Sequence, residues 1–458
     1  MTMRDVTTRR RFLAAASAAA AFAVVPRHVL GGQGRKPPSD TLAVGAVGLG
    51  PMGADNVAAC DGERIAALCD VDPRNAAVPF RHHPKAARYT DYRRMLEKEK
   101  ALDAVIVATP DHTHAVVTVA AMRAGKHVYT QMPLAHDVWE VRQLVRLARE
   151  TKVATQMGNE RYSAPTLREA VEWIRDGCVG TVREVQCWTH HPEWPQGMTR
   201  RPGRAVPHGG LDWDLWLGPA PERPYHTAYH PYTWRGWRDF GTGALGAVGC
   251  HTMDGAYWAL DLAEAKTVTV EADAGGLTDE AWPAASTVRY RFGPRGDLPP
   301  VTVTWYDGGR RPPMPEEMPE TREFIGSAGT IFVGEKGRLT YGGITAGTHP
   351  GQAGPRFIPE SLGWSYKKPK ASIPRVKGKG RWVESSRHIQ EWVAACKGGR
   401  PACARFDVTG PLAELVLLGN AALAAGEPIT YEPATMKVTG SPKGDALLRR
   451  PYRKGWML

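Results

Sequence analysis

The sequence lacks the patterns that mark metal centres, repeats and membrane spans. Its seven cysteines form no C-x-x-C pair, and its histidines lack the fixed i, i+4 pairing with acids that a zinc motif shows. After the N-terminal region no apolar run is long enough to cross a membrane, and no internal repeat is present. We therefore predict no metal, and no membrane span in the mature protein. Cys69, Cys187 and Cys250 lie in apolar segments, so we expect buried free thiols rather than disulfides.

Acidic residues are fewer than basic ones, 47 Asp and Glu against 59 Lys and Arg, which gives a net charge of +12. No nucleic-acid-binding motif accompanies this excess, so we predict no nucleic-acid partner. Solvated basic loops are the first interpretation, and an anionic substrate or cell-envelope partner is the second. The 458 residues, 42% of them hydrophobic, are enough for two globular domains.

The N-terminus has the features of an export signal, a basic motif followed by an apolar stretch. Thr8–Leu13 resembles a twin-arginine motif, and an alanine-rich apolar stretch, Ala14–Val25, follows it. Ala21–Ala23 offers a small-x-small cleavage site. We predict that residues 1–36 are a twin-arginine-type signal peptide and linker, and that the protein is exported to the periplasm or cell envelope.

A glycine turn organises the first domain. Ala43–Val47 is a short apolar strand, and Gly48, Gly50 and Gly53 after it fit the spacing G-x-G-x-x-G. In that pattern the first glycine permits the turn, the second lets the backbone approach a pyrophosphate, and the third lets the helix pack on the strand. The N–H groups at the start of the helix then face the phosphates. The turn therefore predicts a dinucleotide site.

An acidic residue stands where such a site needs one. A second apolar strand, Arg64–Cys69, ends at Asp70, close to 20 residues beyond the glycines. An acid at that distance holds the hydroxyls of the adenosine ribose. Because its charge repels a 2′-phosphate, we predict NAD as the cofactor, with NADP as the less favoured alternative.

Strands and helices alternate as far as Met157, which predicts a parallel α/β sheet and a Rossmann domain over residues 37–157. Ala104–Ala108 and Lys126–Thr130 are further strands of this sheet. Residues at the carboxyl ends of such strands line the ligand crevice. The predicted cofactor-binding residues belong to the glycine turn, the acid and these strand ends: Gly48, Leu49, Gly50, Pro51, Met52, Gly53, Asp70, Thr109, Pro110, His112, His114, Gln131, Met132 and Pro133.

The second half of the chain has a different pattern, because few helices separate its strand-like runs. This predicts a mostly antiparallel sheet in a separate α+β domain over residues 158–458, which we assign to substrate binding and oligomerisation. The predicted strands are 182–189, 267–272, 286–292, 301–306 and 330–333. The predicted helices are 165–175, 385–397 and 410–425.

Tryptophan and histidine are concentrated in one segment of the chain. Residues 188–258 contain seven of the fifteen tryptophans and six of the fifteen histidines. Aromatic rings beside hydrogen-bonding side chains suit a sugar, whose C–H faces stack while its hydroxyls bond. The alternative is that these tryptophans fill the core, and for any single one the two interpretations weigh equally. His190 and Trp237, in the two densest parts, are candidate substrate-binding residues.

Several stretches together resemble the Gfo/Idh/MocA oxidoreductases, the family of glucose–fructose oxidoreductase and inositol dehydrogenase. They are the glycine turn, Asp70, Ala108–Ala115, Gln131–Ala135, Gly243–His251 and, as in exported bacterial members, Leu211–Pro221 and Arg453–Trp456. The resemblance implies a Rossmann domain followed by an open-faced mixed sheet, and a homo-oligomer. It also implies hydride transfer from a sugar or polyol hydroxyl to NAD(P).

Two departures from the family pattern fall on proton-transfer positions. The family's Glu-Lys-Pro is here Gln131-Met132-Pro133, and its aspartate four residues before the histidine is here Ala247. Neither a thioether nor a methyl group can move the proton that alcohol oxidation releases. His251 remains, with Asp254 one turn further along the helix. We therefore predict His251 as the general base.

Three hypotheses stay open for function. The first is an exported NAD-dependent oxidoreductase of a sugar or sugar derivative, with His251 as base, His190 as helper, and Trp237 and Asp254 in the substrate site. The second is an NAD-assisted glycosidase, which oxidises the sugar transiently, eliminates the aglycone and returns the hydride. The third is a catalytically impaired sugar-binding protein. Because free NAD is scarce outside the cytoplasm, an exported enzyme is expected to bind its cofactor tightly before export.

Overall fold

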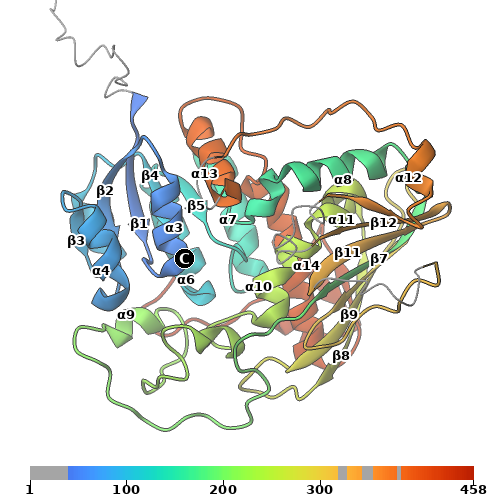
Figure 1. Ribbon diagram of the computed structural model, residues 1–458. Coiled ribbons are helices and arrows are strands. Elements are labelled where there is room, and N and C mark those ends of the chain that lie inside the picture. Colours follow the sequence, from blue (N-terminus) through green and yellow to red (C-terminus); the bar gives the residue numbers. More distant parts are fainter. Residues whose placement is uncertain (1–39, 318–326, 343–353, 379–382) are drawn as a thin grey trace, which may run out of the picture. The chain divides into compact units, whose positions relative to one another are not determined.

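The computed structural model describes residues 40–317, 327–342, 354–378 and 383–458 (Figure 1). The chain divides into two compact units, 1–42 and 43–458. The predicted signal peptide and linker, residues 1–36, lie outside the described residues. The second unit contains two sheets, one of six strands and one of nine.

The first sheet is parallel, with the strand order β3-β2-β1-β4-β5-β6. Its strands are β1 (Ala43–Val47), β2 (Arg64–Cys69), β3 (Ala87–Tyr89), β4 (Ala104–Val107), β5 (His127–Thr130) and β6 (Thr155–Met157). β1 and β4 are buried along their whole length, as apolar runs are when helices cover both faces of a sheet. The strand order reverses between β1 and β4, and ligands of such sheets bind beyond the carboxyl ends at that point. The predicted Rossmann fold is confirmed.

The helices of this domain are α3 (Pro51–Ala59), α4 (Pro73–His82), α5 (Tyr92–Lys98), α6 (Asp111–Arg123) and α7 (Val138–Thr151). Side chains of Asp72, Asp91 and Asp137 cap the N-termini of α4, α5 and α7. The start of α3 has no side-chain cap, because Gly50 and Pro51 stand there. The first N–H groups of α3 therefore remain available to an anion.

The second sheet has the order β13-β12-β11-β7-β10-β9-β8-β14-β15. Its strands are β7 (Val182–Thr189), β8 (Val268–Gly275), β9 (Ala285–Phe292), β10 (Val301–Tyr306), β11 (Ala328–Gly334), β12 (Gly337–Gly342), β13 (Arg356–Ile358), β14 (Ile429–Glu432) and β15 (Lys437–Thr439). β7 and β10 run parallel and the other described pairs are antiparallel, so the predicted mostly antiparallel sheet is confirmed. The strands β12 to β15 were not predicted. β13 and β15 have only three residues each, too few to show alternation.

The remaining helices are α8 (Pro165–Arg175), α9 (Trp213–Leu217), α10 (Gly243–Thr252), α11 (Asp254–Ala259), α12 (Leu362–Ser365), α13 (Val383–Cys396), α14 (Phe406–Ala425) and α15 (Pro442–Ala446). α14 packs on α7, α10 and β8 and so joins the two domains (Figure 1). It is the one described helix long and apolar enough to cross a membrane, but 83% of its apolar window is buried inside the protein. One buried cluster accordingly runs from Val105 of the first sheet to Val303 of the second and includes Cys69, Cys187 and Cys250, which are free thiols as predicted.

Residues 190–242, which we call the aromatic segment, connect β7 to α10 with only two short helices, α9 and η3 (Thr233–Gly236). Figure 1 draws this segment in green. Its own small core consists of Trp216, Leu217, Ala220, Tyr229, Trp234, Trp237 and Phe240. Backbone hydrogen bonds tie it to the Rossmann domain, from His112 N–H to Phe240 O at 3.2 Å and from Asp212 N–H to Val71 O at 3.0 Å. The aromatic segment therefore lies against the ligand side of the parallel sheet.

Candidate active site

A cavity of about 440 Å³ lies at the carboxyl ends of the parallel strands. Its wall is formed by the glycine turn, the ends of β2, β4 and β5, the aromatic segment, α10 and the C-terminal tail. The predicted site residues on this wall are Gly48, Gly50, Pro51, Met52, Gly53, Asp70, Thr109, Pro110, His114, Gln131, Met132 and His251. One space thus joins the predicted cofactor residues to the predicted base.

The three glycines of the turn meet different surroundings. Gly48 has a φ of +84°, and a Cβ there would lie 2.5 Å from the carbonyl oxygen of Ala108; a Cβ on Gly53 would lie 2.0 Å from the carbonyl oxygen of Gly48. A Cβ on Gly50 would meet nothing within 4 Å. Packing within the protein therefore requires the first and third glycines, whereas the space in front of Gly50 is open to the cavity. Together with the uncapped start of α3, this space fits a pyrophosphate.

Asp70 is oriented by two backbone N–H groups. Its Oδ2 accepts from Leu49 at 2.6 Å and its Oδ1 accepts from Asp72 at 2.8 Å. Leu49 itself is buried away from the cavity wall and contributes through this backbone bond. Each carboxylate oxygen keeps a second lone pair, which suits a pair of ribose hydroxyls. Burial raises the pKa of Asp70 to about 6, although the two hydrogen bonds act to lower it. The carboxylate is therefore ionised at neutral pH.

Two buried polar atoms at the ends of β4 and β5 also fit a ligand. Thr109 Oγ1 and Gln131 Nε2 have no hydrogen-bond partner among the described residues, and both residues line the cavity. Buried polar atoms are rarely left unpaired in a protein. A hydroxyl and an amide facing the same space are the groups that would bind the polar atoms of a nicotinamide nucleotide. The residues present therefore fit the predicted cofactor.

The two histidines in the first turn of α6, His112 and His114, have structural partners. His112 is buried off the cavity wall, with Nδ1 3.1 Å from Phe240 O and Nε2 2.9 Å from Trp216 O, and burial lowers its pKa to about 3. It fastens α6 to the aromatic segment and does not face the cofactor space. His114 lies 2.8 Å from both Pro133 O and Thr109 O, so it links the ends of β4 and β5. Pro133 contributes this carbonyl and is not on the wall.

His251 lies on α10 and faces the cavity. Its Nδ1 is buried and has no hydrogen-bond partner in the described part of the chain. Burial, with a smaller effect of the Arg161 charge, lowers the pKa of His251 to about 3, so the imidazole is neutral and can accept a proton. Ala247 and Met132 are on the same wall. The two residues predicted to replace the family's proton carriers thus both line the cavity.

Three residues predicted to bind substrate lie away from the cavity wall. His190 Nε2 is 2.8 Å from Glu193 Oε1 near the surface. Trp237 is buried in the core of the aromatic segment, where its Nε1–H donates to Ala228 O at 2.7 Å. Asp254 is fully buried behind α10 and accepts from Tyr341 Oη–H at 3.0 Å, and burial raises its pKa to about 7. Trp237 and Asp254 therefore have the surroundings of structural residues.

The wall also contains residues that were not predicted, namely His191, Trp194, Tyr232, Trp234, Arg235 and Trp456. The guanidinium of Arg235 packs over the rings of Tyr232 and Trp234 at 4.6 and 4.3 Å, and burial lowers its pKa. Trp456 stands over the guanidinium of Arg93 at 5.0 Å. All of these residues except Trp456 belong to the stretch between Trp188 and Trp258 that the sequence singled out, but no sequence pattern shows which of two adjacent side chains faces inward.

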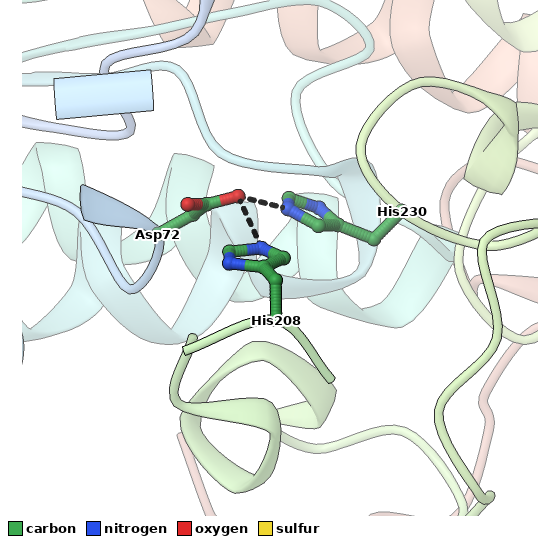
Figure 2. A group of neighbouring side chains, drawn as sticks. All are labelled: Asp72, His208 and His230. Carbon is green, nitrogen blue, oxygen red and sulfur yellow. Dashed lines mark hydrogen bonds and ion pairs between the residues drawn. The ribbon is translucent and has the colours of Figure 1, made fainter. Parts of the chain in front are cut away.

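A histidine clasp, formed by Asp72, His208 and His230, fastens the aromatic segment beside Asp70. Figure 2 shows both imidazoles pointing to the same carboxylate oxygen, with Nε2–Oδ2 distances of 2.8 Å for His230 and 3.1 Å for His208. Asp72 is fully buried and also caps α4, and its N–H donates to Asp70. His230 is on the cavity wall. The clasp therefore connects the covering segment to Asp70 through Asp72.

Metal-ligand atoms approach one another at three places in the described ranges: the histidine clasp, His190–His191–Glu193 and His388–Glu391–Cys403. In the clasp, Arg74 Nη2 lies 3.3 Å from the shared Asp72 oxygen, and in the third group Arg168 Nη2 lies 2.9 Å from Glu391. In these two groups a guanidinium at the carboxylate occupies the position that a metal cation needs. In the second group His190 Nε2 lies 2.8 Å from Glu193 Oε1, so these two atoms already pair with each other. We assign no metal to these groups.

Comparison with known proteins identifies the family. Residues 42–159 match the Gfo/Idh/MocA oxidoreductase family model for the NAD-binding Rossmann fold, and residues 177–296 match its C-terminal alpha/beta domain. The two matches together cover more than half of the 458 residues. The chain belongs to the Gfo/Idh/MocA oxidoreductase family. Its first domain is an NAD-binding Rossmann domain, as predicted.

Individual relatives match parts of the chain. A glycosyl hydrolase family 109 protein of Shewanella pealeana is 32% identical over 172 residues, which are 34% of this chain and 37% of the relative. One from Shewanella baltica is 28% identical over 216 residues, 41% of this chain and 47% of the relative. The chain thus covers less than half the length of these Gfo/Idh/MocA relatives.

Solved structures match the whole fold at lower identity. The WlbA dehydrogenase of Bordetella pertussis, in complex with NADH and UDP-GlcNAcA, has a TM-score of 0.58 at 16% identity, over 85% of this chain and 98% of that chain. The aldose-aldose oxidoreductase of Caulobacter crescentus, complexed with glycerol, has a TM-score of 0.54 at 18% identity, over 85% and 99%. At these identities the likeness shows the fold of the family.

Proposed function

We propose that this chain is an NAD-dependent oxidoreductase that oxidises a hydroxyl of a sugar or sugar derivative, with His251 as general base. The observation that carries the proposal is the single cavity in which the glycine turn and Asp70 share a wall with His251. The solved relative that holds UDP-GlcNAcA supports the substrate class. The aromatic rings of Trp194, Tyr232 and Trp234 on the wall supply surfaces on which sugar C–H faces stack.

The glycine turn and Asp70 hold the cofactor in this proposal. The open space before Gly50 and the N–H groups of α3 receive the pyrophosphate, and Asp70 receives the ribose hydroxyls. The charge of Asp70 disfavours a 2′-phosphate, so NAD is preferred over NADP. NAD, when bound, accepts a hydride from the substrate carbon.

The proton that leaves the substrate hydroxyl goes to His251. This imidazole is neutral at pH 7 because burial lowers its pKa to about 3, so a proton can be accepted in every turnover. The same burial makes the resulting imidazolium unfavourable, and neither Met132 nor Ala247 can share its charge. The proton must therefore leave His251 quickly, through water or another side chain of the cavity.

An NAD-assisted glycosidase is the second candidate, and the match to the glycosyl hydrolase family 109 relatives favours it. In that reaction the hydride returns to the sugar, so the products are the free sugar and the aglycone. A third candidate, an impaired sugar-binding protein, is favoured by Met132 and Ala247 on the wall.

One experiment distinguishes these functions. The purified chain, supplied with NAD, is incubated with a panel of free sugars, sugar nucleotides and aryl glycosides, and NADH, ketosugar and aglycone are measured. Accumulating NADH and ketosugar support the proposal, whereas aglycone released without net NADH supports the glycosidase. Sugar binding without any product would contradict both and leave the binding protein.

We further propose export by the twin-arginine route, based on Thr8–Leu13 and the apolar stretch after it. Replacement of both Arg9 and Arg10 by Lys is expected to keep the protein in the cytoplasm, whereas the native sequence directs it to the periplasm. Cell fractionation with an antibody measures this distribution. An unchanged distribution in the double variant would contradict the route.

A further inference from the structure

Four histidines line the cavity, and they differ in what their rings bind. His114 has both ring nitrogens on backbone carbonyls, and His230 has Nε2 on Asp72. The Nδ1 atoms of His191, His230 and His251 are buried and have no hydrogen-bond partner among the described residues, but the His230 ring is already fixed through its Nε2 on Asp72. Two imidazoles in one cavity are therefore left for a ligand to bind.

His191 is held in place by packing rather than by hydrogen bonds of its ring. It follows the end of β7, its N–H donates to Thr189 Oγ1 at 3.3 Å, and its ring stacks on Trp194 at 5.5 Å. The ring of His190 lies 4.3 Å away but binds Glu193 outside the wall. Of these two adjacent histidines, His191 is the one whose ring faces the cavity.

We infer that His191 is a second proton-transfer residue, which shares with His251 the proton released from the substrate hydroxyl. The inference rests on the proposed function and adds a residue that takes over the role left vacant by Met132 and Ala247. Both residues lie on the wall of the same cavity, so both imidazoles are available to a sugar bound there. His191 and His251 are catalytic residues in this arrangement, since both contact the substrate.

The chemical step balances without a further reactant. The substrate C–H bond breaks as the hydride passes to NAD, the O–H bond breaks as the proton passes to an imidazole, and a C=O bond forms. The imidazole that accepts the proton becomes an imidazolium, and the second, neutral imidazole stabilises it by accepting a hydrogen bond or the proton itself. A charge on His191 disfavours a charge on His251, so the pair carries one proton at a time and then releases it to water.

The test compares His191→Asn with His190→Asn in the full chain loaded with NAD. We expect His191→Asn to lower kcat by about 10²-fold or more, the usual contribution of a general base, with little change in KM. His190→Asn should cost far less, since its ring is off the wall. In the wild type, the pH profile of kcat should have an acid limb that is lost in His191→Asn, and added imidazole should restore part of the activity of His191→Ala.

A second measurement does not depend on turnover. Diethyl pyrocarbonate modifies accessible neutral imidazoles, and mass spectrometry of peptides locates the products. A sugar that is turned over should protect His191 but not His190, and NAD binding should be the same in wild type and His191→Asn, which shows that the variant is folded.

The outcomes separate the two claims. Full turnover in His191→Asn, or a larger loss in His190→Asn, would overturn the inference and leave the oxidoreductase proposal intact. A loss in His191→Asn that imidazole does not rescue in His191→Ala, with no protection by sugar, would mean a structural role and also overturn it. A wild type that turns over no sugar would overturn both.

Discussion

Asp70 and His251 are the two buried titratable residues on which the proposed chemistry depends. Burial raises the pKa of Asp70 to about 6 and lowers that of His251 to about 3, since it favours the neutral form of each. At pH 7 Asp70 is nevertheless ionised and His251 is neutral. These are the states that ribose binding and proton acceptance require.

Asp70→Asn is expected to weaken NAD binding by about 1.5–3 kcal/mol, the contribution of hydrogen bonds to a charged group, and to reduce the discrimination against NADP. In the wild type, NAD affinity should fall as the pH falls through about 6, because the Asp70 carboxyl gains a proton. The variant should show a flat profile. Calorimetric titration of cofactor-stripped protein measures both effects, and equal affinities in the two proteins would remove Asp70 from the site.

His251→Ala is expected to lower kcat by roughly two to four orders of magnitude, as loss of a general base does, without changing NAD affinity. Met132→Lys should not raise activity, because Gln131 and Ala247 stand where the family has the carboxylates that would accompany this lysine. Single-turnover reduction of the bound NAD by the sugar, followed by NADH absorbance, tests both variants. A fully active His251→Ala would exclude the histidine from the reaction.

At the scale of elements, the glycines of the turn between β1 and α3 have different roles. Gly53 is needed for packing within the protein, and Gly50 leaves space for a ligand. Gly50→Ala should leave the thermal unfolding temperature within a few degrees of wild type, since a Cβ there meets nothing within 4 Å. It should still weaken NAD binding, because the methyl group occupies the pyrophosphate space. Gly53→Ala should destabilise the fold by about 1–3 kcal/mol, as overpacking does. Scanning calorimetry and NAD titration of both variants check this; tight NAD binding by Gly50→Ala would contradict it.

The histidine clasp acts between elements, since it joins the aromatic segment to the turn between β2 and α4. His230→Ala is expected to accelerate NAD release by about tenfold or more, because it removes a hydrogen bond to a buried carboxylate. His208→Ala should have a smaller effect, since His208 is partly exposed. His226→Ala, outside the clasp, is the matched control. The rate of NADH release is measured from the change in NADH fluorescence when excess NAD displaces bound NADH. Wild-type release in both clasp variants would mean that the clasp does not retain the cofactor.

At the scale of the whole molecule, the cavity is closed by parts from distant regions of the chain. The aromatic segment and Trp456 of the C-terminal tail complete a wall begun by the Rossmann domain. Arg453 N–H donates to Pro219 O at 3.0 Å, so the tail and the aromatic segment hold each other. Slow release of a ligand requires such a packed, many-sided site, because tight affinity resides mainly in a small off-rate.

Protein purified without added cofactor is therefore expected to carry about one NAD(H) per chain, in keeping with this argument from off-rates. The hydride must then return to a second substrate or to the same sugar, which predicts ping-pong or redox-neutral turnover. Denaturation of the purified protein, followed by mass spectrometry of the released nucleotide, measures the content. An empty protein that binds NAD only weakly would contradict retention and leave either a cytoplasmic enzyme or a binding domain.

The sequence alone determined the parts that depend on local rules. Gly48 and Gly53 are required by contacts within a few residues or with the adjacent strand, and Asp70 follows its strand at a fixed distance. The bounds of α8 and β10 were predicted to the residue, because apolar spacing along a short stretch decides which face is buried. The departures predicted at Met132 and Ala247 rest on position within motifs in the same way.

Only the tertiary structure decided which side chains face the cavity. His191 rather than His190 lies on the wall and Trp237 lies in the core, because packing against distant segments sets the direction of a side chain in an irregular loop. The clasp joins Asp72 to His208 and His230 across 136 and 158 residues. Such contacts form between surfaces that meet only after both domains have folded, so no spacing along the chain encodes them.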